Sequence, residues 1–265
     1  MDNKRLAVIG HGAIARDVMA EISARFTGYS LAVLHRSEQS DRVLDGITHV
    51  ATLDEVLAWK PDLVIEAAGH DAVLAYVPLC LERGVPVLLS SVGALHDDAL
   101  FEHLIAQAVR GQTRLVLPSG AIGGLDYVRA SQWTEQTVIT YESRKPLKAW
   151  QDELLARGYD LAGIDQPVLL FEGSAREAAR LYPSNLNVAA TLALAGIGMD
   201  STQVRVMADP FISGNQHHIH VQSDHGTMSV QFANEPSRLN PKSSRIVAKS
   251  IVAAVQQYFS PTQFL

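Results

Sequence analysis

The sequence predicts an α/β protein of two domains, and three observations lead to this fold class. Short apolar segments alternate with longer segments of helical periodicity through residues 1–118, which is the pattern of repeated strand–helix–strand units. Beyond Pro118 the pattern changes to longer strands in which apolar and polar residues alternate. A glycine-rich turn follows the first predicted strand. We therefore expect a doubly wound parallel sheet and a second α+β domain with a mixed, largely antiparallel sheet.

The parallel sheet of the first domain is expected from apolar segments with strand character. These segments are residues 5–9, 31–34, 63–67, 85–89 and 114–117, with a weaker segment near Val50. The helices between them are expected at residues 13–25, 53–59, 71–83 and 97–110. Residues 63–68 are almost continuously apolar, which is typical of a strand covered by helices on both faces.

The strands of the second domain are expected at residues 138–142, 204–207, 219–222 and 227–232, separated by helical stretches. A turn at Asn240-Pro241 precedes residues 243–259, whose apolar residues have nearly helical spacing. This last helix is free to pack on either domain. We place the first domain at residues 1–118, completed by the C-terminal helix 243–265, and the second domain at residues 119–242.

Composition and charge exclude several classes of protein. The chain has 265 residues, of which 47% are hydrophobic, so a folded core is expected. The net charge, 22 − 28 = −6, leaves no basic stripe for nucleic acid. No apolar segment approaches the ~20 residues of a membrane helix, and the first residues contain no signal-peptide core, so we expect a soluble cytoplasmic protein. The single cysteine, Cys80, lies among apolar residues, which favours packing over reactivity.

The glycine-rich turn predicts a dinucleotide site. It has the pattern G-x-G-x-x-A after a strand and at the start of a helix, the context of a Rossmann-type fingerprint. Gly10 permits the tight turn, Gly12 lets the backbone approach a pyrophosphate, and Ala15 allows the helix to pack closely on the strand. The helix start, with Ala13 and Ile14, offers N–H groups to phosphates. These residues are candidate ligands of NAD or NADP, and a chance glycine turn in another α/β fold is the alternative.

The end of the second strand departs from this fingerprint. An Asp or Glu that binds the adenosine ribose is expected there, but the sequence reads Leu34-His35-Arg36-Ser37. Arg36 is a candidate partner for a 2′-phosphate, with Ser37 as a second donor, so we expect NADP to be accepted at least as readily as NAD. The alternative is that Arg36 stacks on adenine or lies in solvent.

Loops at residues 67–70 and 90–94 are expected at the same edge of the sheet as the glycine turn. They either contact the cofactor or simply form turns.

Four of the ten histidines lie within nine residues, at positions 217, 218, 220 and 225. If residues 216–222 form a strand, His218 and His220 share one face, and His217 shares the other with Ile219 and Val221. His218 and His220 have the spacing to hold a metal, but no cysteine or compact carboxylate set accompanies them, which favours a solvated polar face. His217 is expected to point inward, where burial sets its pKa for proton transfer. A buried structural histidine is the alternative.

Small residues at the domain junction are expected to line a cleft between the domains. The junction reads Pro118-Ser119-Gly120-Ala121-Ile122-Gly123-Gly124-Leu125-Asp126. Farther along, Asn187 begins a predicted helix. Its amide is a candidate partner for a carboxamide or carboxylate, and capping of the helix is the alternative.

The chain resembles the L-aspartate dehydrogenase family from the glycine turn to the last helix. The residues that carry the resemblance are the junction 118–126, Asn187-Val188-Ala189-Ala190-Thr191, Gly214-Asn215-Gln216-His217 and Asn240-Pro241-Lys242-Ser243-Ser244. Of these, the Pro-Ser-Gly-Ala run at the start of the junction is fairly specific. The resemblance departs from the family at His35-Arg36, where many members carry an acidic residue, and this puts strict NAD preference in doubt.

The resemblance implies oxidation of L-aspartate to iminoaspartate with NAD or NADP. The imine then feeds NAD biosynthesis or hydrolyses to oxaloacetate and ammonia. The family's catalytic histidine falls on His217, and its cofactor contacts fall on Ala121 and Asn187. The family is typically dimeric, with the sheet of the second domain at the interface, which implies a homodimer.

Such a substrate has two carboxylates that need cationic or hydroxyl partners. Lys242, Ser243 and Ser244, at the start of the last helix, are candidates, with His218 behind them. Because the chain as a whole is acidic, local cations such as Lys242 must attract a doubly anionic substrate.

Two other functions remain compatible with the sequence. A reductase of the dihydrodipicolinate-reductase type shares the domain plan, but its His-His-x-x-Lys cluster is not matched, because no lysine follows His217-His218 at that spacing. A non-catalytic NAD(P)-binding sensor is compatible because fold does not fix function.

Overall fold

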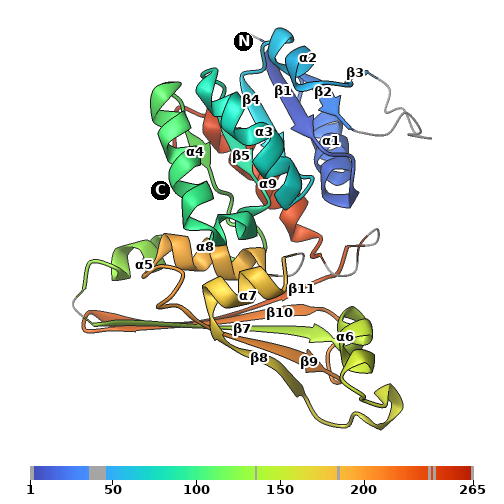
Figure 1. The fold of residues 1–265 in the computed structure, drawn as a ribbon, viewed down its shortest axis with the longest axis vertical. Coiled ribbons are helices and arrows are strands. Elements are labelled where there is room, and N and C mark those ends of the chain that lie inside the picture. Colours follow the sequence, from blue (N-terminus) through green and yellow to red (C-terminus); the bar gives the residue numbers. More distant parts are fainter. Residues whose placement is uncertain are drawn as a thin grey trace. The chain divides into compact units, whose positions relative to one another are not determined.

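The computed structural model describes residues 3–35, 46–134, 136–183, 186–237, 240 and 243–263, which form two compact units. Unit 1 comprises residues 1–120 together with 248–264, and unit 2 comprises residues 121–247. Each unit is built around a sheet of its own (Figure 1).

Unit 1 contains a parallel sheet with the strand order β3-β2-β1-β4-β5-β6 among the described residues. This order is that of a doubly wound Rossmann fold and confirms the predicted fold class. The elements in chain order are β1 (Lys4–Ile9), α1 (Ala13–Arg25), β2 (Tyr29–Leu34), β3 (Ile47–Val50), α2 (Leu53–Ala58), β4 (Leu63–Glu66), α3 (His70–Glu82), β5 (Val87–Leu89), α4 (Asp98–Arg110) and β6 (Leu115–Val116).

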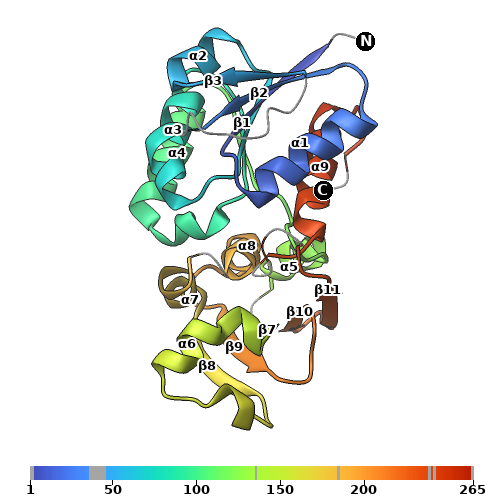
Figure 2. The same cartoon turned by 90° about the vertical axis from the view of Figure 1, so that its right-hand side faces the viewer.

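Helices cover both faces of this sheet. In Figure 2, α3 and α4 lie on one side of the strands, and α1 lies on the other side with α9 (Ile246–Phe259). The last helix is held there by the ion pair between Lys249 and Glu21 of α1. The hydroxyl of Ser250 also accepts a hydrogen bond from the N–H of Gly120, at 2.9 Å. Strand β4 is buried along its whole length, as a strand covered on both faces must be.

Unit 2 contains a mixed sheet with the strand order β11-β10-β7-β9-β8. Strands β7 and β9 are parallel and the other neighbours are antiparallel, which confirms the predicted mixed, largely antiparallel sheet. The elements in chain order are α5 (Leu125–Ser131), β7 (Thr137–Pro146), α6 (Gln151–Ala156), β8 (Val168–Ser174), α7 (Ala175–Leu181), α8 (Asn187–Ala195), β9 (Gln203–Asp209), β10 (Asn215–Ser223) and β11 (Gly226–Asn234).

Strand β8 was not expected from the sequence, and the last helix begins later than expected. A bulge between Leu169 and Phe171 interrupts the alternation along β8, which hides the period-two pattern by which strands are recognised. Helix α9 begins at Ile246 and not at Ser243. Ser244 instead forms an antiparallel bridge with Pro236.

The two faces of the unit 2 sheet differ in their surroundings. Helices α5, α7 and α8 cover one face (Figures 1 and 2). Buried side chains such as Ile139, Ile219 and Val221 lie on the strands toward this cover. The intervening residues of the same strands form the open face and are mostly polar, with the exposed Val138 as an apolar exception. The strict alternation along β7 and β10 separates the two sets.

Within the part of the chain that the structure describes, no helix has both the length and the hydropathy that crossing a bilayer requires.

Candidate active site

The turn after β1 has the shape that a dinucleotide needs. Gly10 has φ of 113°, and a Cβ placed there would lie 2.7 Å from the carbonyl oxygen of Ala67, so only glycine fits. In contrast, no described atom lies within 4 Å of a Cβ placed on Gly12, the N-cap residue of α1. Ala13 and Ile14 follow in the first turn of the helix, whose N–H groups have no partner within the helix. This open cradle of backbone donors fits a pyrophosphate.

A buried carboxylate fixes the neighbouring loops at the same edge. Glu66, at the end of β4, is 0% exposed. Its Oε1 accepts the N–H groups of Ala68 and Gly69 at 2.8 and 2.9 Å, and its Oε2 accepts the N–H of Ser91 at 2.9 Å. These loops lie within the segments predicted at the sheet edge, but Glu66 itself was not predicted. The sequence did contain a signal that could have identified it, namely a single acidic residue at the end of an otherwise apolar strand.

Arg36 and Ser37, the predicted partners of a 2′-phosphate, lie outside the described residues. His35 is described and directly follows β2. It lies beside His11 of the glycine turn, with 5.2 Å between the ring centroids.

In unit 2, His217 lies on the covered face of the sheet, the face that the alternation predicted. Its side chain is 3% exposed. Its Nδ1 is hydrogen-bonded to the hydroxyl of Tyr141 on the adjacent strand β7, at 2.7 Å. Its Nε2 is buried and has no partner among the described residues. One ring nitrogen is therefore held while the other is available for chemistry.

Burial and positive charge keep His217 neutral. Burial is the larger cause that lowers its pKa, to about 3, and the positive charge of Lys145 is the next. Lys145 is itself only 2% exposed and lies on the same face of β7 as Tyr141. Its Nζ lies 5.7 Å from the centroid of the Trp150 ring. A buried lysine beside a neutral histidine is an arrangement typical of functional sites.

Tyr141 and Lys145 were not predicted from the sequence, although a signal was present. The expected strand ended at Glu142, whereas β7 continues to Pro146. Extending the alternation from Ile139 through Tyr141 places Lys145 on the apolar face of the strand. A lysine at such a position is unusual and points to a function.

Asn215 and Ser244 extend this arrangement. Asn215 precedes His217 by two residues on the covered face of β10 and is 1% exposed. Its Nδ2 donates to the hydroxyl of Ser244 at 3.1 Å. The structure thus brings Ser244, a predicted substrate contact, to the strand that carries His217. Ser243 precedes Ser244, and its carbonyl accepts the N–H of Ser237. Lys242 lies outside the described residues.

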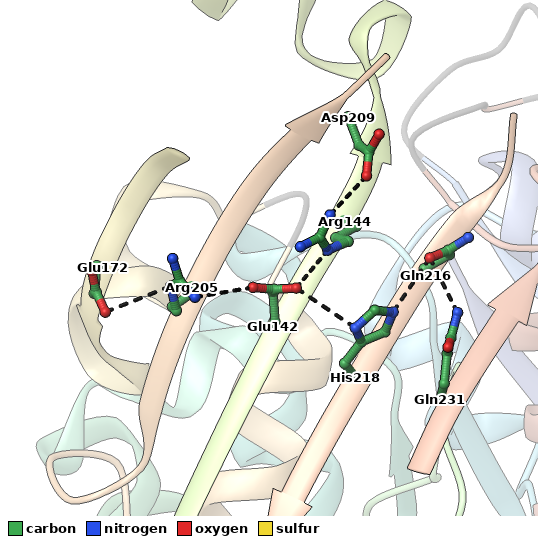
Figure 3. Close-up of polar contacts among 8 residues, drawn as sticks. All are labelled: Glu142, Arg144, Glu172, Arg205, Asp209, Gln216, His218 and Gln231. Carbon is green, nitrogen blue, oxygen red and sulfur yellow. Dashed lines mark hydrogen bonds and ion pairs between the residues drawn. The ribbon is translucent and has the colours of Figure 1, made fainter. Parts of the chain in front are cut away.

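His218 lies on the open face, away from His217. Its Nδ1 is 3.6 Å from Oε1 of Glu142, within a chain of polar contacts on this face (Figure 3). The structure does not bring His218 together with His217 and Ser244, because neighbouring residues of a strand point to opposite faces.

Ala121 and Asn187, which the family resemblance assigned to the cofactor, both lie in unit 2. The carbonyl of Ala121 accepts a hydrogen bond from Nδ2 of Asn234, at 2.8 Å. Asn187 is the first residue of α8, and the N-cap position belongs to Leu186, which makes no side-chain capping bond. Asn187 therefore lies one residue after the N-cap position that the sequence suggested for it.

No group of three or more His, Cys, Asp or Glu side chains among the described residues is arranged to hold a metal ion. Cys80 is buried, and burial raises the pKa of its thiol to about 12.

The whole chain is similar in sequence to a known dehydrogenase. L-aspartate dehydrogenase 2 from Bordetella bronchiseptica is 46% identical over 261 residues, which cover 97% of this chain and 97% of that protein. The chain belongs to the L-aspartate dehydrogenase family.

Two family models divide the chain in agreement with this membership. The model described as aspartate dehydrogenase, C-terminal, matches residues 126–258. The model described as homoserine dehydrogenase, NAD binding domain, matches residues 10–118. The first range contains His217 and Lys145, and the second contains the glycine turn.

Solved structures show the same fold. Aspartate dehydrogenase from Thermotoga maritima matches with a TM-score of 0.75 and 22% identity, covering 99% of each chain. Dihydrodipicolinate reductase from Paenisporosarcina sp. TG-14 matches with a TM-score of 0.53 and 12% identity, covering 97% of this chain and 92% of the other. Because identity is low in both cases, these matches concern architecture, and membership of the L-aspartate dehydrogenase family rests on the sequence.

Proposed function

We propose that the protein catalyses the NAD(P)-dependent oxidation of L-aspartate to iminoaspartate, which hydrolyses to oxaloacetate and ammonia. One observation carries the proposal: a buried, neutral His217 has one nitrogen held by Tyr141 and the other without a partner among the described residues, in a chain of the L-aspartate dehydrogenase family. The glycine turn supports the cofactor half of the reaction.

The reaction removes a hydride from Cα and protons from the amino nitrogen. The substrate ammonium first gives a proton to a base. The electron pair of the Cα–H bond then leaves as hydride, while the nitrogen lone pair forms the C=N bond. Loss of a second proton gives the imine, and addition of water with loss of ammonia gives oxaloacetate. A base and a hydride acceptor are therefore both required.

His217 is our candidate for the base. When its Nδ1–H donates to the oxygen of Tyr141, the lone pair of Nε2 is free to take the ammonium proton. Burial raises the pKa of Tyr141, so the phenol stays protonated and fixes the ring without competing for the proton. A substrate carboxylate near the imidazole raises the pKa of His217, because a negative charge favours the protonated ring.

Lys145 is our candidate for binding one substrate carboxylate. It is a buried cation whose charge already acts on His217. A carboxylate paired with Lys145 offsets that charge and makes His217 more basic. Binding of the substrate carboxylate therefore also activates the base. Ser244, Ser243 and Lys242 are proposed partners for the other carboxylate.

When bound, the nicotinamide ring supplies the acceptor for the hydride. The backbone around Gly10, Gly12, Ala13 and Ile14 is proposed to hold the pyrophosphate. Ala121, Asn187 and Arg36 remain proposed cofactor contacts, with Arg36 favouring acceptance of NADP. The family resemblance adds a homodimer formed through the unit 2 sheet and a role in supplying NAD biosynthesis. We include these in the proposal, together with the cytoplasmic location expected from the composition.

The test follows the absorbance of the reduced cofactor with L-aspartate, D-aspartate, L-glutamate and L-alanine, using NAD and NADP in turn. We expect turnover with L-aspartate and little with the others. The reverse assay, with oxaloacetate, ammonia and reduced cofactor, should consume the cofactor. No turnover with L-aspartate, or a better substrate in the panel, rejects the proposal, and binding of cofactor without any turnover favours the sensor alternative.

A further inference from the structure

Three histidines and an arginine gather at one corner of the unit 1 sheet. The rings of His11 and His35 lie 5.2 Å apart between centroids, and those of His35 and His49 lie 5.4 Å apart. Nε2 of His35 is hydrogen-bonded to Nδ1 of His49, at 3.1 Å. Arg16, on the first turns of α1, contributes a positive charge that acts on His11. We call these four residues the histidine corner.

The topology places this corner where a dinucleotide carries its adenosine. His11 lies in the turn after β1, His35 directly follows β2, and His49 lies near the end of β3. These strands are parallel neighbours, so their carboxyl ends share one edge. In a Rossmann fold the end of the second strand contacts the adenosine ribose at its 2′ position.

The corner has unused hydrogen-bonding capacity. His11 Nε2, His35 Nδ1 and Arg16 Nε are buried, and none has a hydrogen-bond partner among the described residues. Buried polar atoms normally have partners. A phosphate offers several acceptor oxygens, whereas a ribose hydroxyl offers one oxygen, so these donors match a phosphate better than a hydroxyl.

The charges around the corner also favour an anion. Burial lowers the pKa of His11, and repulsion from His35, Arg16 and His49 lowers it further, with no carboxylate of the described residues among the causes. In the first turn of α2, the neighbouring acidic groups are Asp54 and Glu55, and Glu55 accepts the N–H of Ala51. An anion bound beside His11 would offset the positive charges that act on this imidazole.

We propose that the histidine corner is a binding site for the 2′-phosphate of NADP, and that it selects NADP over NAD more strongly as the pH falls. This inference rests on the proposed use of a dinucleotide. The phosphate supplies a negative charge, so its binding is coupled to uptake of a proton by the imidazoles. NAD lacks this phosphate, and its binding has no such coupling.

The test measures binding of two fragments without nicotinamide by calorimetry at pH 8 and pH 6.5. They are 2′,5′-ADP (adenosine 2′,5′-bisphosphate) and AMP (adenosine 5′-monophosphate), which differ only in the 2′-phosphate. We expect the ratio of the two dissociation constants to shift toward 2′,5′-ADP by roughly tenfold per pH unit for each proton taken up. At pH 7.5, repetition in buffers of different ionisation enthalpy should show more proton uptake with 2′,5′-ADP than with AMP.

Variants identify the residues responsible. His35→Gln should remove most of the pH dependence and leave the affinity for AMP within about twofold, since a neutral amide cannot take up a proton. His49→Gln, at an exposed position that folding tolerates, should have the same effect in weaker form. His103→Gln changes an exposed histidine on α4 and is the matched control, which should behave like the unaltered chain.

Two outcomes overturn the inference, and they differ in what else they affect. If AMP binds but 2′,5′-ADP shows no pH-dependent advantage, or keeps it in both histidine variants, the corner is not a phosphate site, while the proposed dehydrogenase function stands. If neither fragment binds at either pH, the corner and the proposed dinucleotide function fail together.

Discussion

His217 and His218 are adjacent in the chain, yet they lie in opposite environments. His217 is 3% exposed, is held by Tyr141 and has a pKa lowered to about 3. The side chain of His218 is 36% exposed and lies beside the carboxylate of Glu142. The difference arises because β10 has one face covered by helices and one face open. Chemistry on this strand is therefore decided by the face on which a residue lies.

Charged side chains also differ in burial and pairing between the two faces of the sheet. On the covered face Lys145 is buried near a neutral imidazole, so its charge acts strongly on its surroundings. On the open face the charges alternate in sign, and their exposure ranges from the buried Asp209 to the exposed Glu172. Figure 3 shows Glu142 between Arg144 and Arg205, with Asp209 and Glu172 beyond them. We expect substitutions on the covered face to change catalysis, and those on the open face to change stability slightly.

The largest expected effect is that of His217→Gln, with His218→Gln as the matched variant on the open face. Loss of the base should lower kcat with L-aspartate by at least ~100-fold. His218→Gln should change kcat by less than about twofold, since its side chain lies away from the covered face. Steady-state rates at saturating cofactor provide the measurement. Equal losses in the two variants would contradict the distinction between the faces.

Lys145→Met should chiefly weaken substrate binding. Removing a buried cation that pairs with a carboxylate should raise the KM for L-aspartate by about tenfold or more. The same change should raise the pKa of His217, since a neighbouring positive charge is lost. NMR titration of the imidazole checks the second effect without substrate. An unchanged KM together with an unchanged imidazole titration would remove Lys145 from the site.

Tyr141→Phe should have a smaller effect, because it removes the group that orients the base and keeps the base itself. We expect kcat to fall by about tenfold and the free energy of unfolding to fall by about 1–3 kcal/mol, since His217 Nδ1 is left buried without a partner. Urea unfolding and steady-state rates give the two values. A fall in stability with no change in kcat would make Tyr141 structural only.

The buried histidine should also make stability depend on pH. An exposed histidine has a pKa near 6.5, whereas that of folded His217 is about 3. Between these values the unfolded chain binds a proton that the folded chain does not, so the free energy of unfolding falls as the pH falls. His217→Gln lacks this contribution and should lose about 2 kcal/mol less than the unaltered chain between pH 7 and pH 4.5. Parallel losses in urea unfolding at the two pH values would show that the pKa of His217 is not lowered.

Some features of the site could be predicted from sequence patterns alone. Period-two alternation was sufficient to place His217 and His218 on opposite faces, because the side-chain period of a strand is fixed. The glycine turn was recognised because its geometry excludes other residues at Gly10. Lys145 was missed because the strand was ended too early, at Glu142.

Other contacts had no local pattern that could reveal them. The partnership of Tyr141 with His217 joins residues 76 positions apart. The contact of Asn215 with Ser244 likewise depends on the path of the chain after β11. The grouping of His11, His35 and His49 depends on strand order, which brings three separate segments of the chain to one edge. Such sites emerge only when the register of the sheet is known.

The smallest expected effect is on the open face, where Glu142→Gln tests the polar network of Figure 3. Glu142 accepts a hydrogen bond from Arg144 at 2.5 Å and lies 3.4 Å from Nη1 of Arg205. Because two partners of Glu142, Arg205 and His218, are partly exposed and salt screens their interaction with it, the substitution should lower the free energy of unfolding by only about 1 kcal/mol, and less at high salt. Urea unfolding at low and high ionic strength measures this, with kcat for L-aspartate unchanged. A loss of activity comparable to that of Lys145→Met would mean that the open face contributes to catalysis, and that the two faces of the sheet do not divide chemistry from stability.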